Sequence, residues 1–88
     1  MPEQPDLLDT LAVIESLSGN HQSAQDTIAR ALAARPGDIS MRYHEAMIAA
    51  ARGDNTQAIA ALEELVTKDV AEFPERAEAL ALLQKLKG

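Results

Sequence analysis

The chain has 88 residues, which is enough for one small domain. Its apolar residues are mostly alanine and leucine, 17 and 11 of them, and because both residues lead the helix-propensity scale, the composition predicts an all-α fold. A net charge of −6 argues against binding of nucleic-acid phosphates, which requires lysine and arginine. With no cysteine in the sequence, disulfides and thiolate metal sites are excluded.

The sequence carries no sign of membrane insertion or export. No apolar run reaches the roughly 20 residues of a membrane-spanning helix. The first nine residues lack the basic start and apolar centre of a signal peptide. We therefore expect a cytoplasmic protein without membrane contact. A periplasmic location stays open if the sequence is an excerpt of an exported protein.

The first helix is expected to follow an N-cap at Asp6 and to run to about Ser18, and a tight turn joins it to a second helix at 21–34. Asp6 and Asn20 are residue types that cap helix N-termini through their side-chain oxygens. Gly19, which can adopt a positive φ, is expected to end the first helix.

The next helices follow the same local rules. Pro36 and the glycine after it stop the second helix, and Asp38 caps a third helix expected at 39–52. Gly53 closes that helix, and Asp54 begins a fourth, expected at 55–68. After an irregular connection, Pro74 is expected in the first turn of a fifth helix at 75–86. The residues expected in the core of the second to fifth helices are small or aliphatic: Ala24, Ile28, Ala31, Leu32, Met41, Ala46, Ile48, Ala49, Ala58, Ile59, Leu62, Leu65, Val66, Ala79, Leu80, Leu82, Leu83 and Leu86.

Turn glycines and small or aliphatic residues recur at a fixed interval of 34 residues. The pairs are Gly19 with Gly53, Ala12 with Ala46, Ala24 with Ala58, and Ile28 with Leu62. A constant period of this length in a helical sequence is typical of stacked helix hairpins. The pattern predicts an α-solenoid of antiparallel hairpins with five helices.

These residues resemble the tetratricopeptide repeat, a helix–turn–helix unit of 34 residues. The first copy carries the family pattern at Leu8, Leu11, Ala12, Glu15, Ala24, Ile28, Ala31 and Pro36. The second carries it at Arg42, Glu45, Ala46, Ala49, Ala58, Leu62, Leu65 and Val70. The resemblance implies one domain over 1–88, with repeats at about 5–38 and 39–72 and a capping helix at about 74–87.

Four positions depart from the family pattern. Glu15 replaces the preferred tyrosine, Arg42 and Glu45 replace large apolar residues, and Val70 replaces the closing proline. Because a buried carboxylate without a partner is costly, we expect Glu45 to face water or to pair with a base such as Arg30 or Arg42.

The resemblance implies binding of an extended peptide or a helix in a concave groove lined by the first helix of each repeat. Carried onto this sequence, the groove-facing residues are Asp9, Val13, Ser16, Tyr43, Met47 and Ala50. Tyrosine and methionine are frequent interface anchors. The alternative, that Tyr43 and Met47 only pack inside the domain, stays open. The basic clamp with which one subclass holds C-terminal carboxylates is missing, so that ligand is not expected.

A structural role is the alternative function. The first helix is apolar on more than one side, and Leu7, Leu11 and Ile14 are candidate contacts for a homodimer or for a neighbouring repeat in a longer array. Residues 73–80 are similar to the ends of bacterial tetratricopeptide proteins of assembly and export systems, which keeps that setting open.

No pattern in the sequence indicates catalysis. The two histidines, His21 and His44, lack the spacing of a metal site, and the four glycines do not form a phosphate loop. The serines have no evident base. We expect a protein that is not an enzyme and that holds no metal or cofactor.

Overall fold

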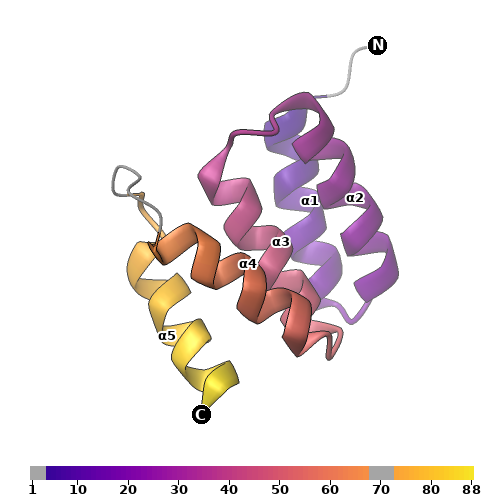
Figure 1. Ribbon diagram of the computed structural model, residues 1–88. Helices are drawn as coiled ribbons and strands as arrows, with labels where there is room; N and C mark the ends of the chain where they lie inside the picture. The colour runs from indigo at the N-terminus through magenta and orange to yellow at the C-terminus, as the bar shows by residue number, and fades with distance from the viewer. Residues whose placement is uncertain (1–3, 68–72) are drawn as a thin grey trace.

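A computed structural model describes residues 4–67 and 73–88 (Figure 1). Within these residues it contains five helices and no strand: α1 (Pro5–Leu17), α2 (His21–Ala34), α3 (Ile39–Ala51), α4 (Asn55–Thr67) and α5 (Arg76–Lys87). The prediction of an all-α fold with five helices is confirmed. None of the described helices is long and apolar enough to cross a membrane.

The turns after α1 and α3 have the same geometry. Gly19 and Gly53 have φ of 88° and 90°, in the region that only glycine adopts without strain. In the first turn the amides of Gly19 and Asn20 donate to carbonyls three and five residues back, at 3.1 and 2.8 Å. The second turn repeats both bonds at 3.0 and 2.9 Å. This is the Schellman arrangement, which satisfies the last carbonyls of a helix and reverses the chain tightly.

The helix starts follow the predicted caps in part. The Asp38 carboxylate accepts from the Met41 amide at 3.0 Å, and Asp54 accepts from Gln57 at 3.3 Å, so both caps are confirmed. Asn20 holds the N-cap position of α2 without a side-chain bond.

The prediction that Asp6 is the N-cap of α1 is wrong. Gln4 takes that position because Pro5, whose ring fixes φ and which has no N–H to satisfy, suits the first helical residue. Asp6 lies in the first turn instead and binds Arg35 at the end of α2, with 2.8 Å between carboxylate and guanidinium.

The start of α5 also differs from the prediction. Pro74 lies in a turn before the helix, which begins at Arg76 with Glu75 as its N-cap. The Arg76 amide donates to the Phe73 carbonyl at 3.1 Å, and this bond closes the turn. Most of the predicted connection before Phe73, and the predicted last residue of the fourth helix, lie outside the described residues.

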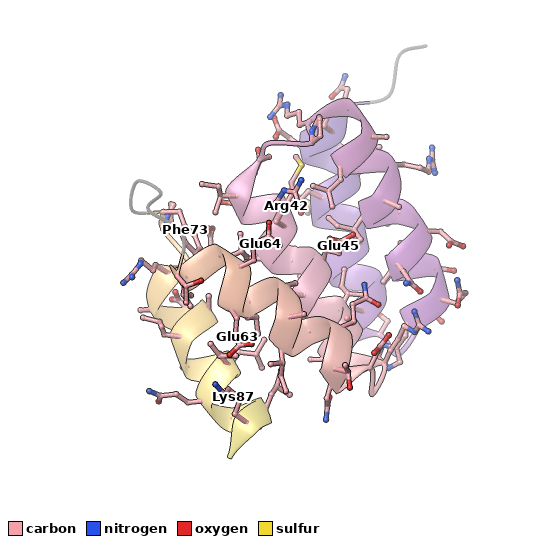
Figure 2. The ribbon with its side chains drawn as sticks, viewed as in Figure 1. Arg42, Glu45, Glu63, Glu64, Phe73 and Lys87 are labelled. Carbon is pink, nitrogen blue, oxygen red and sulfur yellow. The ribbon has the colours of Figure 1, made fainter. Side chains whose placement is uncertain are left out.

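The helices form two antiparallel hairpins, α1–α2 and α3–α4, followed by α5 (Figure 1). Each helix packs on its sequence neighbour; in addition α1 contacts α3, and α3 contacts α5. Among the described residues α2 and α4 make no contact with each other. The first helices of successive hairpins therefore form one row, with α1 at one end and α5 at the other. Lys87 and Glu63, 3.0 Å apart, fasten the end of α5 to α4 (Figure 2).

The core consists of two clusters that share α3. The first joins α1, α2 and α3: Leu8, Ala12, Ala24, Ile28, Ala31, Met41 and Ile48. The second joins α3, α4, α5 and the turn before α5: Tyr43, Ala46, Leu62, Leu65, Phe73, Ala79 and Leu83. The residues paired by the 34-residue interval, apart from the turn glycines, are at most 1% exposed. Alanine at these positions lets the helix backbones approach closely, which is why the interval predicts the packing.

Of the residues expected in the core, most are buried. Five at the edge of the clusters are only partly buried, namely Leu32, Ile59, Val66, Leu82 and Leu86. Leu80 is also half-buried.

Candidate functional site

The row formed by α1, α3 and α5 presents a surface that we call the three-helix face. On it, Asp9 of α1 meets His44 of α3, with 2.7 Å between the carboxylate oxygen and Nδ1. Both side chains are about one-fifth exposed. A partly desolvated hydrogen bond of this kind is stronger than one in open water, so it fixes the spacing of α1 and α3.

A second bond joins α3 to α5 on the same side of the stack. The Ser40 hydroxyl donates to the Glu75 carboxylate at 2.6 Å. Both this pair and the Asp9–His44 pair join residues that are 35 positions apart. The equal separation indicates that α5 follows α3 as α3 follows α1, so the last helix continues the row.

Tyr43 lies next to this surface but points into the second core cluster. It is 9% exposed, and its ring centroid is 5.5 Å from that of His44. Burial raises the pKa of the Tyr43 phenol, and the carboxylates of Glu78 and Glu75 raise it further. Two carboxylates at the start of α5 therefore lie near the Tyr43 phenol.

The six residues expected in a groove fall into two groups. Asp9, Val13, Met47 and Ala50 are half-buried. Ser16 and Tyr43 are 8% and 9% exposed. Tyr43 therefore packs inside the domain, which was the alternative to a place in the groove. Met47 packs on the second cluster but keeps part of its surface accessible.

A small cavity lies on another side of the molecule, between α3 and α4. Its volume is about 40 Å³, and it is lined by Arg42, Glu45, Ala61, Glu64 and Leu65. Figure 2 shows the three charged residues around this junction. The cavity is of the size that holds water rather than a cofactor. Glu45, expected to face water or a base, is half-buried and shares the lining with Arg42.

Arg42 itself is held away from the core by a bond to the backbone. Its Nε donates to the Pro36 carbonyl at 2.9 Å. This bond explains how the position can hold an arginine, where the resemblance had led us to expect a large apolar residue.

The third surface runs along the outer side of α1 and is made by Leu7, Leu11 and Ile14. We call it the end face of α1, because α1 is the first helix of the row. These side chains are 64%, 45% and 54% exposed, and Leu17 on their flank is 82% exposed. They are the large hydrophobic residues that the described part of the chain leaves exposed.

Sequence reasoning placed Asp9 and His44 correctly on α1 and α3 but missed the bond between them. It also missed the bond of Ser40 to Glu75. Both pairs are 35 residues apart, one more than the 34-residue interval, so a search for polar pairs at that separation could have found them.

No protein-family model, curated protein or solved structure matches this chain.

Proposed function

We propose that the chain is a non-catalytic, tetratricopeptide-like module that binds a helix or an extended segment of another protein on the three-helix face. The observation that carries the proposal is the bond between Asp9 and His44. It holds two helices of a row in fixed register, with Val13 and Met47 one turn further along them, half-buried and accessible in part.

The chemistry of this surface favours one kind of segment. Accessible aliphatic and thioether groups suit an apolar anchor, and methionine adapts its shape to different anchors. Glu75 and Glu78 place two carboxylates near the α5 end, against the one positive charge of Arg76. A segment with an apolar centre and a basic residue toward the α5 end complements both features.

Site-specific photocrosslinking tests the proposal. A photoreactive amino acid in place of Met47 should capture a discrete partner in cells that express the protein. The same amino acid in place of the exposed Ala60 on α4 is the control and should capture nothing at that mass. The purified partner segment should then bind the native chain, and Met47→Glu should weaken its binding at least tenfold.

Circular dichroism should show unchanged helicity for Met47→Glu, so that lost binding reports the surface and not unfolding. Equal capture from positions 47 and 60, or binding that survives Met47→Glu, contradicts the proposal. The control is Ala60→Glu, which adds the same charge at an exposed position of α4 and should bind the segment as the native chain does.

A further inference from the structure

The end face of α1 has a counterpart inside the molecule. Thirty-four residues after Leu7 and Ile14 come Met41 and Ile48 of α3, which are 1% and 0% exposed. They belong to the cluster that α3 forms with α1 and α2. In α3 this helix face is therefore buried against other helices, and in α1 the equivalent face is exposed to solvent.

The open face has the spacing of a helix–helix seam. Leu7, Leu11 and Ile14 follow one another at intervals of four and three residues, and polar Gln4 and Ser18 continue the spacing at both ends. Alternating intervals of three and four residues keep side chains in line along a helix and allow knobs-into-holes packing. The face is a short apolar stripe with polar ends, suited to another helix laid along it.

We propose that this face binds the same face of a second copy of the chain, with the two α1 helices antiparallel. The charges favour a second copy over a charged partner. The stripe itself carries no ionisable side chain. Asp6 beside it is paired with Arg35, and Glu15, which follows Ile14, is half-buried with one carboxylate oxygen that has no hydrogen-bond partner. Close approach of two stripes therefore places apolar side chains against each other and adds no charge from the stripe to the interface.

The antiparallel direction also has an electrostatic reason. The C-terminal turn of α1 has no basic residue to offset its negative dipole end. Antiparallel packing brings Arg35, which lies half-exposed beside the start of α1, next to that turn of the second copy. Parallel packing would leave both C-terminal turns together and uncompensated.

The exposed area suits a weak, reversible dimer. Side chains exposed to this degree form an apolar patch of several hundred Å², which is at the upper end for a monomer. Two such patches with their polar borders approach the ~1,000 Å² that a specific interface buries. Because each copy has one such face and contributes it, the assembly closes at two copies.

Sedimentation and engineered cysteines test the proposal. The native chain should sediment as a dimer, and Leu11→Glu as a helical monomer with unchanged circular dichroism. Ala33→Glu, the same charge on an exposed position of α2, should remain a dimer. These variants leave the three-helix face intact, so partner binding there is scored separately.

The chain has no cysteine, so a single introduced thiol reports one contact. Leu11 lies near the middle of the stripe, and Leu11→Cys should oxidise to a covalent dimer. Antiparallel packing holds the two copies of position 17 about 18 Å apart along the axis, too far for a disulfide. Leu17→Cys should thus cross-link much more slowly, although it is more exposed.

Two results overturn the proposal. One is a native chain that stays monomeric at millimolar concentration. The other is cross-linking of Leu17→Cys as fast as that of Leu11→Cys, which would indicate parallel packing or random collision.

Discussion

The faces of α1 and α3 that lie 34 residues apart in the sequence meet different surroundings. Ile48 of α3 is fully buried in the first core cluster, whereas Ile14 of α1 is 54% exposed. The residue between these positions also differs in polarity. It is the apolar Leu11 in α1 and the charged Glu45, which lines a small cavity, in α3.

Exposure along this row depends on which element packs against each helix face. The α3 helix follows a packed hairpin and buries its face against it, while no described element lies on the same face of α1. The apolar character of the α1 face is therefore unexplained by packing within the described chain. It calls for a partner surface.

The largest expected effect comes from shortening the two isoleucines. Ile48→Ala should cost about 3 kcal/mol of unfolding free energy, because it leaves a cavity in the core. Ile14→Ala, in dilute solution, should change it by less than about 0.5 kcal/mol. Chemical denaturation of both variants measures the contrast. At high protein concentration the Ile14→Ala variant should lose stability relative to the native chain if the end face is paired. Equal losses at low concentration would break the comparison.

The two turns should respond alike. Gly19→Ala and Gly53→Ala should each cost about 1 kcal/mol, because a side chain is strained at positive φ. The space around both glycines is open, so no clash adds to the cost. Gly37→Ala is the matched control: it lies outside the positive-φ region with open space around it and should be neutral or slightly stabilising. Unequal costs at 19 and 53, measured by thermal melts, would show that the two turns are not equivalent.

A third prediction concerns Glu45, the α3 counterpart of Leu11. Glu45→Leu should be neutral or stabilising by up to about 1 kcal/mol, since it removes a half-buried carboxylate and restores an apolar residue. A thermal melt measures the change. A large loss for Glu45→Leu would instead assign this carboxylate a specific polar role.

The smallest effect concerns Tyr43, whose counterpart in α1 is Asp9. Burial raises the pKa of Tyr43 above its usual 10, with Glu78 and Glu75 adding to the shift. Stability should therefore be unaffected at neutral pH and should fall above about pH 10, because the unfolded chain releases this proton first. Tyr43 is the single tyrosine, so phenolate absorbance reports it directly. Glu78→Gln should lower that pKa; an unchanged value would remove the carboxylate from the explanation.

Local features of the fold were predictable because each depends on a few adjacent residues. The positive φ at Gly19 and Gly53 and the caps at Asp38 and Asp54 follow from the conformations and hydrogen bonds available to those side chains. The exceptions are also local: two competing residues, Pro5 and Asp6, could start α1, and the sequence does not show which prevails.

Features of the candidate site were predictable only in part. The resemblance to the tetratricopeptide repeat implied that Asp9, Val13 and Met47 face one side of neighbouring helices, and those positions are half-buried and accessible in part. It could not show that Tyr43 is buried in the second core cluster, because that cluster includes Phe73 from the turn after the predicted repeats.

Backbone preferences and side-chain size act locally and repeat with the 34-residue interval, so the helices, their turns and the positions of the small residues could be read from the amino acids. The bond between Asp9 and His44, and the burial of Ile48 but not of Ile14, follow from how the helices pack. Those outcomes depend on which helix lies alongside, and two equal patterns in a chain acquire different neighbours when one stands at the end of the row.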